Sequence, residues 1–257
     1  MRRVGAGLFR LAAGDGGQPV RAVCFPHAGG SASAFHAWPA LLEAAADVLA
    51  LTLPGRGIRI RDELIADLPG IARAVADDLQ GGNLLDRPYV LFGHSMGGLV
   101  AYATASELAR RGLPPATVVG ISATPAPWSA QSAAPAQQSD DELLDRLRSF
   151  EATPESTLTG NAALRALLPA IRADFEACDG YRPAPRPLDS PVLCWAGTRD
   201  PVAPVETVRA WSEVAAAGFE LELLDASHFY LDEHGSRIIR GLLAGLITAP
   251  AATQEFA

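Results

Sequence analysis

Short apolar runs alternate along the chain with longer stretches in which apolar residues recur at helical spacing. In one such stretch, Ile71, Val75 and Leu79 follow one another at intervals of four residues, which indicates a helix with one buried face. The runs expected to be strands cover residues 20–26, 48–53, 88–92, 117–122, 191–196 and 219–224. The stretches expected to be helices cover residues 35–46, 71–79, 98–111, 205–217 and 232–247. Strands that are apolar throughout and separated by helices predict an α/β protein with a mostly parallel sheet and helices on both faces.

The sequence Gly93-His-Ser-Met-Gly97 lies directly after the apolar run 88–92 and directly before a helical pattern. A strand, a tight turn with one serine and a helix together describe a nucleophile elbow, whose strained turn exposes the serine hydroxyl. The residues two before and two after Ser95 must be small in such a turn, and both are glycine. The N-terminal amides of the following helix favour negative charge at the same place. This context predicts a nucleophile at Ser95; the alternative is an ordinary glycine-rich turn between a strand and a helix.

A serine hydroxyl needs a base that takes its proton, and a histidine base needs a carboxylate that holds its tautomer. Among the five histidines, His228 follows the expected strand 219–224, where a base is expected in this arrangement. An ordinary solvated loop residue is the alternative for His228. His94 lies inside the elbow, and we expect it to point away from the serine side chain.

The carboxylate is expected from Asp200, which lies just beyond the end of the preceding expected strand. The order Ser95, Asp200, His228 also matches the chain order of the α/β-hydrolase triad. An aspartate before a proline is a common turn former or helix cap, which is the alternative role for Asp200. Asp225 and Asp232 are closer to His228 in sequence. We expect Asp225 to tighten the loop and Asp232 to cap the last helix.

A tetrahedral intermediate needs backbone amides that donate to its oxygen. One donor is expected to be the N–H of Met96, immediately after the nucleophile. The other is expected from the loop Phe25-Pro-His-Ala-Gly-Gly30, whose small residues let the backbone approach a substrate closely. The candidate there is the N–H of Ala28, with Gly29 as the alternative donor. An ordinary glycine-rich turn into a helix is the other interpretation of this loop.

Residues 123–187 interrupt the alternation of strands and helices with a proline-rich segment. One helical pattern in it follows the capping-box sequence at 139–142, and a second runs from about 162 to 178. A helical insertion between two strands is most simply a lid over the active-site edge, with a helical subdomain that has no gating role as the alternative. We therefore expect a single domain over residues 1–257, with a lid insertion at about 123–187.

Composition excludes several kinds of chemistry. All 21 basic residues are arginine, so the chain has no lysine for a Walker-type phosphate loop, a pyridoxal-phosphate Schiff base or a Ser–Lys dyad. A net charge of −8 argues against nucleic acid as a partner. Neither a pattern of metal ligands nor a dinucleotide-binding fingerprint is present, so we expect no metal and no cofactor.

Cysteine content and hydropathy bear on location. The three cysteines are an odd number without close spacing, which suits a reducing compartment. The N-terminal apolar stretch is interrupted at Arg10 and is shorter than the apolar core of a signal peptide. Because no apolar run approaches the length of a membrane span, we expect no membrane association and a cytoplasmic protein.

Several of these stretches together resemble type II thioesterases, the stand-alone α/β-hydrolases that accompany polyketide synthases and nonribosomal peptide synthetases. They are Phe25-Pro-His-Ala-Gly-Gly-Ser-Ala-Ser33, Leu53-Pro-Gly-Arg-Gly57 and the elbow Gly93-His-Ser-Met-Gly-Gly98, with the late Asp200 and His228. The resemblance spans nearly the whole chain. It implies hydrolysis of acyl groups from the phosphopantetheine arm of acyl or peptidyl carrier proteins, which clears stalled or mis-primed units. By position, it implies Ser95 as nucleophile, His228 as base, Asp200 as orienting carboxylate, and the N–H groups of Ala28 and Met96 as oxyanion donors.

Three hypotheses about function follow. The first is a carrier-protein thioesterase, the second is a serine hydrolase of another substrate class such as a carboxylesterase, and the third is a non-catalytic binding protein on this fold. Carrier proteins are typically acidic, and this chain is acidic too, so docking needs local arginine patches or apolar contacts. Arg56, Arg59 and Arg61 form such a local cluster in the sequence, with an ordinary solvated surface as the alternative.

Overall fold

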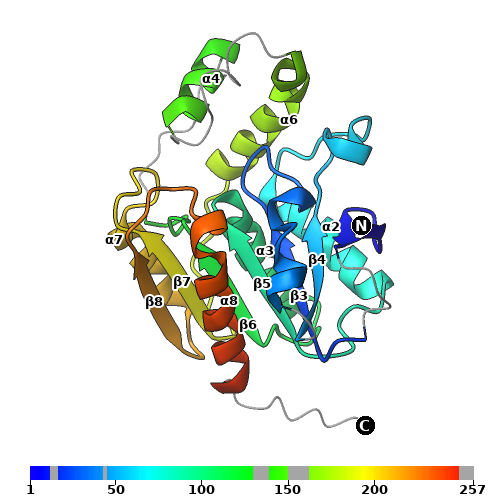
Figure 1. Ribbon diagram of the computed structural model, residues 1–257, viewed down its shortest axis with the longest axis vertical. Coiled ribbons are helices and arrows are strands. Elements are labelled where there is room, and N and C mark those ends of the chain that lie inside the picture. Colours follow the sequence, from blue (N-terminus) through cyan, green and yellow to red (C-terminus); the bar gives the residue numbers. More distant parts are fainter. Residues whose placement is uncertain (12–16, 43–44, 130–138, 150–161, 249–257) are drawn as a thin grey trace.

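The computed structural model describes residues 1–11, 17–42, 45–129, 139–149 and 162–248 (Figure 1). Within these ranges the strands form one eight-stranded sheet in the order β1-β2-β4-β3-β5-β6-β7-β8. The strands are β1 (Arg2–Arg3), β2 (Leu8–Arg10), β3 (Val20–Phe25), β4 (Ala46–Leu51), β5 (Tyr89–His94), β6 (Val118–Ser122), β7 (Val192–Gly197) and β8 (Phe219–Leu224). From β4 across the sheet through β3, β5, β6 and β7 to β8, all pairings are parallel. Only β1 and β2 add antiparallel pairings, at one edge.

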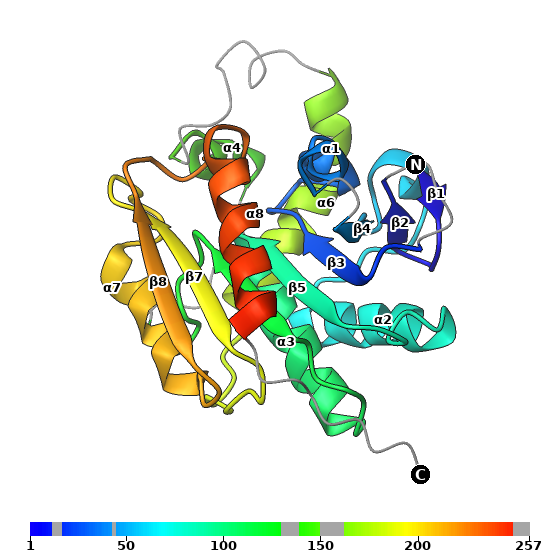
Figure 2. The ribbon, with the colours of Figure 1, turned by 60° about the horizontal axis from the view of Figure 1, so that its bottom comes forward.

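Helices cover both faces of the sheet (Figure 2). Their bounds are η1 (Ala32–Phe35), α1 (Trp38–Leu42), η2 (Gly57–Arg59), α2 (Leu68–Gly81), α3 (Met96–Arg110), α4 (Asp140–Ser149), α6 (Ala162–Asp179), α7 (Val205–Arg209), η3 (Ala210–Val214) and α8 (Leu231–Thr248). Neighbouring residues of β5 point to opposite faces: Leu91 packs with α2 and α3, and Phe92 packs with α1 and α8. The α/β-hydrolase-type architecture predicted from the sequence is confirmed.

Two expected helices are wrong in extent. Among the described residues of the stretch 35–46, η1 ends at Phe35 and only the short α1 follows, because Pro39 has no N–H that could bond to residue 35 and continue a helix from there. Its last residue, Ala46, already pairs with Val20 in the sheet, so β4 starts earlier than expected. The stretch 205–217 is divided into α7 and the 3₁₀ helix η3.

The antiparallel strands β1 and β2 were not expected from the sequence. They have two and three residues, which is too short for a recognisable alternation. β2 nevertheless lies fully buried along β4, with Leu8 opposite Leu51. Within the ranges described, none of the helices combines the length and apolar character that a membrane span requires.

The insertion between β6 and β7 places α4 and α6 beyond the carboxyl ends of the strands (Figure 1). The predicted capping box is present, since Ser139 N–H donates to a Glu142 carboxylate oxygen at 2.6 Å and Glu142 N–H donates to the Ser139 hydroxyl at 3.2 Å. The two helices share a small apolar cluster that includes Leu143, Ile171 and Phe175. Of the lid expected at 123–187, residues 130–138 and 150–161 lie outside the described ranges.

Candidate active site

Ser95 stands alone between the end of β5 and the start of α3, in a backbone conformation with φ 57° and ψ −123°. A non-glycine residue adopts such values only where its surroundings enforce them. Here Ser95 N–H donates to the Ser122 carbonyl at 2.8 Å, and the Thr124 hydroxyl donates to the Ser95 carbonyl at 2.8 Å. The strained turn that the pentapeptide predicted is therefore present.

The two elbow glycines are required by close backbone contacts. A Cβ on Gly93 would overlap the carbonyl oxygen of Gly97, one turn further on. A Cβ on Gly97 would overlap the carbonyl oxygen of Phe25 at the end of β3. The absence of both side chains lets the start of α3 lie directly against the loop 25–30, which we call the oxyanion loop.

The structure brings Ser95, Asp200 and His228 together, although they are far apart in sequence. His228 Nε2 lies 2.9 Å from Ser95 Oγ, and His228 Nδ1 lies 2.7 Å from Asp200 Oδ2. The other oxygen, Asp200 Oδ1, accepts from Val202 N–H at 2.8 Å and from Ala203 N–H at 3.1 Å. With the Nδ1 proton donated to the carboxylate, a neutral imidazole keeps the Nε2 lone pair for the serine hydroxyl. Asp200 and His228 are 6% and 1% exposed, so this arrangement is shielded from water.

The two alternative carboxylates lie elsewhere. Asp225 forms a surface ion pair with Arg199 at 2.5 Å, and its side chain is 81% exposed. The expectation that Asp232 caps the last helix is wrong, because α8 begins at Leu231 and Asp232 lies within its first turn. A carboxylate there still interacts favourably with the helix dipole.

The backbone amides near Ser95 differ in what they contact. Gly29 N–H donates to Asp174 Oδ2 at 2.7 Å. Neither Ala28 N–H nor Met96 N–H donates a hydrogen bond within the part of the chain that the structure describes. Of the two candidates in the oxyanion loop, the Ala28 amide therefore has no acceptor among the described residues, whereas the Gly29 amide has one.

Two cavities meet at Ser95. One has a volume of about 400 Å³ and extends under the apolar side chains of α6. The other has a volume of about 250 Å³ and extends toward Leu99 and Arg146. Ala28, Ser95 and Phe175 line both cavities. Ser95 can thus be reached from two sides.

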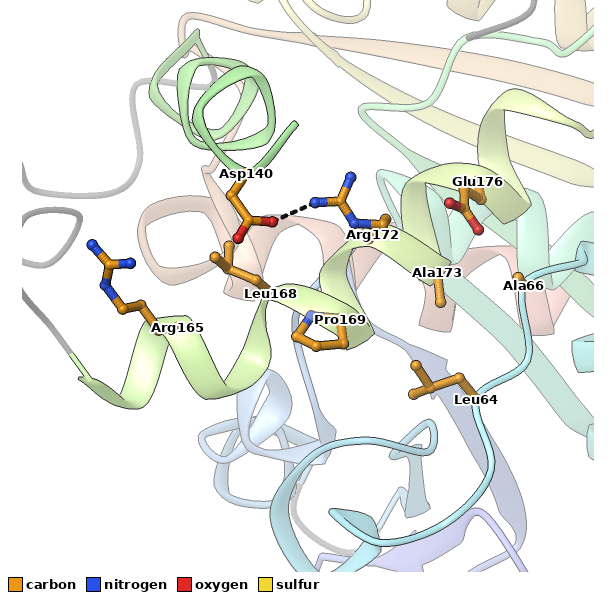
Figure 3. A pocket seen from close by; sticks show the side chains of 9 residues that line it. All are labelled: Leu64, Ala66, Asp140, Arg165, Leu168, Pro169, Arg172, Ala173 and Glu176. Atoms are coloured by element: carbon orange, nitrogen blue, oxygen red, sulfur yellow. Dashed lines mark hydrogen bonds and ion pairs between the residues drawn. The ribbon is translucent and has the colours of Figure 1, made fainter. Parts of the chain in front are cut away.

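A separate hollow of about 420 Å³ lies on the outer side of α6 and does not include Ser95 (Figure 3). Among the described residues, no group of three or more His, Cys, Asp or Glu side chains could hold a metal ion.

Comparison with protein families gives one match that spans most of the chain. A family model described as a thioesterase domain matches residues 21–245, a range that includes Ser95, Asp200 and His228. The chain belongs to the thioesterase domain family. Members of this family are hydrolases that act on thioester bonds.

Individual relatives agree with the family model. A probable cadicidin biosynthesis thioesterase from Streptomyces griseus is 34% identical over 216 residues, which are 84% of this chain and 59% of that protein. The solved structure of the RedJ thioesterase from the prodiginine pathway of Streptomyces coelicolor is 36% identical, with a TM-score of 0.81 and coverage of 91% of this chain and 89% of that one. The type II thioesterase BorB from the borrelidin biosynthetic cluster is 32% identical, with a TM-score of 0.83 and coverage of 96% and 99%. The resemblance to type II thioesterases stated from the sequence is confirmed.

Two further histidines, His27 and His94, lie near His228 in this thioesterase. The ring of His94 lies 5.5 Å from that of His228, and its Nδ1 lies 3.0 Å from the Ser122 hydroxyl. The ring of His27 lies 6.5 Å from that of His94 and 5.0 Å from that of Phe229. Burial lowers the pKa of His27 to about 4 and holds the pKa of His94 well below its usual range. Both imidazoles are therefore neutral at pH 7, so neither places a positive charge near His228.

Acidification should destabilise this thioesterase through His27. The unfolded side chain titrates near 6.5, whereas the pKa of the largely buried imidazole in the folded protein is about 4. Because the unfolded state binds the proton first, the contribution of His27 to stability is complete above the unfolded pKa and is lost as the pH falls toward the folded pKa. Between pH 7 and pH 5, His27 should account for a loss of about 2 kcal/mol in the free energy of unfolding.

Urea denaturation at the two pH values tests this prediction. His27→Gln should lose less stability than the wild type on acidification, by that same amount, because glutamine does not titrate. His36→Gln, at an exposed position, is the control and should keep the wild-type pH dependence. An equal decline in the wild type and His27→Gln would contradict the prediction.

The structure does not support the expectation of a local arginine cluster at the surface. The guanidinium of Arg56 is buried and bonded to Asp174. The Arg59 guanidinium binds the Asp62 carboxylate at 2.7 Å, and the Arg59 side chain is only 13% exposed. Only Arg61 has an exposed position. Sequence reasoning therefore missed the buried role of Arg56, because the arginine-rich pattern 56–61 gives no sign of its partner 118 residues away.

Proposed function

We propose that this chain hydrolyses acyl groups from the phosphopantetheine arm of acyl or peptidyl carrier proteins in polyketide or nonribosomal peptide biosynthesis, as an editing enzyme. The observation that carries the proposal is the Ser95 hydroxyl, 2.9 Å from His228 Nε2, at the junction of two cavities. The biosynthetic relatives support the substrate class. Since such carriers act inside the cell, the proposal also locates the enzyme in the cytoplasm.

In the first half of the reaction, Ser95 Oγ attacks the thioester carbonyl carbon while His228 Nε2 takes the hydroxyl proton. Asp200 accepts the Nδ1–H of His228 and stabilises the imidazolium. The N–H groups of Ala28 and Met96 donate to the oxygen of the tetrahedral intermediate. Collapse breaks the carbon–sulfur bond, and the pantetheine sulfur leaves as a thiol after taking the proton from His228. Because a thiolate leaves more readily than an alkoxide or an amine, departure of the sulfur depends only a little on protonation by His228.

In the second half, water attacks the acyl-serine carbonyl and gives a proton to His228 Nε2. The same two amides stabilise the second tetrahedral intermediate. Its collapse releases the carboxylic acid and returns the proton from His228 to Ser95 Oγ. The first half-reaction thus ends with a neutral imidazole and an acylated Ser95, and the second restores the serine hydroxyl with the imidazole again neutral.

The two cavities at Ser95 give room for the two parts of the substrate on either side of the scissile bond. Within a single hydrolase domain over residues 1–257, the proposal treats the insertion 123–187 as a lid. Ile171 and Phe175 on α6 line the larger cavity, so a displacement of α6 would change access to Ser95.

Acyl-carrier thioesters compared with oxygen esters of the same acyl group test the proposed substrate class. The thioesters should have the higher kcat/KM, on the order of tenfold or more, which corresponds to about 1.4 kcal/mol in the transition state. Release of the acid, which both substrates of a pair yield, is measured for each pair. Ser95→Ala, as the background control, should hydrolyse both substrates only at its low residual rate. A marked preference for the oxygen esters would assign the site to a carboxylesterase instead.

A further inference from the structure

A buried ion pair lies directly against the oxyanion loop. Arg56 Nη1 and Nη2 donate to the two carboxylate oxygens of Asp174 at 2.6 and 2.8 Å. The side chains are 4% and 2% exposed. Arg56 follows β4, and Asp174 lies in the middle of α6, so the pair joins the sheet edge to the helical insertion. Parallel, bidentate bonds of this kind fix both partners in orientation.

The same two side chains hold the end of the oxyanion loop. Asp174 Oδ2 accepts from Gly29 N–H at 2.7 Å, and Arg56 Nη1 donates to the Gly30 carbonyl at 3.2 Å. Within the loop, Gly30 N–H donates to the His27 carbonyl at 2.9 Å, which closes a turn. The loop is therefore held at consecutive residues by one acceptor and one donor from outside it.

This arrangement determines the direction of the Ala28 amide. The His27 carbonyl and the Ala28 N–H belong to one planar peptide unit, so a bond that fixes the carbonyl also fixes the N–H. That carbonyl is held by Gly30, which Arg56 holds in turn, and the next peptide unit is held by Asp174 through Gly29.

We propose that Asp174 and Arg56 are positioning residues, which orient the Ala28 N–H toward the developing oxyanion. Because Asp174 belongs to α6, this orientation depends on the position of α6. Ile171 and Phe175, on the same helix as Asp174, line the cavity at Ser95. A substrate that contacts these side chains and fixes the position of α6 thus also fixes the conformation of the oxyanion loop. The inference rests on the proposed role of Ala28 in acyl transfer.

Asp174→Asn tests this coupling, because it removes the charge with little change in size. A misdirected oxyanion donor should lower kcat by about 10²-fold and leave KM within a few-fold of the wild type. The affinity for a trifluoromethyl ketone, which forms a tetrahedral adduct on Ser95, should fall by the same factor as kcat/KM. Unchanged kcat and ketone affinity would overturn the inference.

Asp140→Asn is the matched control. Asp140, on α4, pairs with Arg172 at 2.5 Å on the outer side of α6 (Figure 3). Arg172 lies only two residues before Asp174 on that helix. This ion pair joins α6 to α4 but does not contact the oxyanion loop. Asp140→Asn should keep the wild-type kcat. Equal losses in the two variants would assign the effect to α6 in general and would contradict a specific positioning role.

A double variant separates positioning from folding. Asp174→Asn leaves a buried arginine poorly paired and lowers the melting temperature, whereas Arg56→Met/Asp174→Leu replaces both charges with apolar groups and should recover much of it. The double variant still lacks the acceptor for Gly29 N–H, so its kcat should stay about 10²-fold low. Recovery of kcat together with the melting temperature would show a purely structural ion pair and would overturn the inference.

All variants are measured on an acyl-pantetheine thioester and on a p-nitrophenyl ester of the same acid, because the oxyanion donors serve both reactions. A wild type that hydrolyses only the ester would refute the proposed thioesterase function. The ratio of variant to wild type on the ester would in that case still support or overturn the positioning role.

Discussion

Replacement of Ser95 by alanine should lower kcat on carrier thioesters by on the order of 10⁴ to 10⁶, and replacement of His228 by alanine should have an effect of the same size. The reason is geometric: the hydroxyl and Nε2 lie 2.9 Å apart, so neither can act without the other. Residual activity would come from substrate binding and from the oxyanion donors alone. Single-turnover rates of thiol release measure the effect.

Because the two side chains act as a unit, the double variant Ser95→Ala/His228→Ala should be little worse than either single variant. Ser236→Ala, at an exposed position on α8, is the control and should keep full activity. Losses that multiply in the double variant would indicate that Ser95 and His228 act independently and would contradict the proposed mechanism.

Asp200→Asn should lower kcat by on the order of 10⁴ while the fold is retained. The carboxylate accepts the Nδ1–H of His228 at 2.7 Å and so keeps the Nε2 lone pair toward the serine hydroxyl. An asparagine amide can instead donate to Nδ1, which favours the tautomer that has its proton on Nε2 and cannot accept the serine proton.

The matched control for this prediction is Asp225→Asn, since Asp225 is closer to His228 in sequence but forms an exposed pair with Arg199. Circular dichroism and the melting temperature establish that both variants are folded, and steady-state kinetics on the same thioester compare them. Near-normal activity of Asp200→Asn, with a large loss for Asp225→Asn, would transfer the orienting role to Asp225.

The parts of this molecule that were predictable from sequence are those that depend on local pattern. The elbow has a signature because the strained turn demands small residues at fixed offsets, here Gly93 and Gly97. Asp200 and His228 were predictable because parallel strands bring their carboxyl ends to one edge of the sheet, so loops far apart in sequence converge there. Strand positions were predictable for the same kind of reason, since buried parallel strands are apolar throughout.

The parts that were not predictable depend on contacts between distant segments. The Arg56–Asp174 pair joins residues 118 positions apart, and only the packing of α6 over the sheet edge brings them together. The contact between the rings of His94 and His228 likewise depends on how the loop after β8 folds back over β5. The edge strand β2 has three residues, and its pairing with β4 rather than its own sequence makes it a strand.

The most direct test of the account is a titration of the enzyme with a fluorophosphonate during hydrolysis of an acyl-carrier thioester, with the modified residue located by peptide mass spectrometry. Thioesterase activity should fall in proportion to the fraction of Ser95 modified and should vanish at one equivalent. Activity that persists when Ser95 is fully modified, or an adduct on a different residue that abolishes activity, would contradict the assignment of Ser95 as the nucleophile.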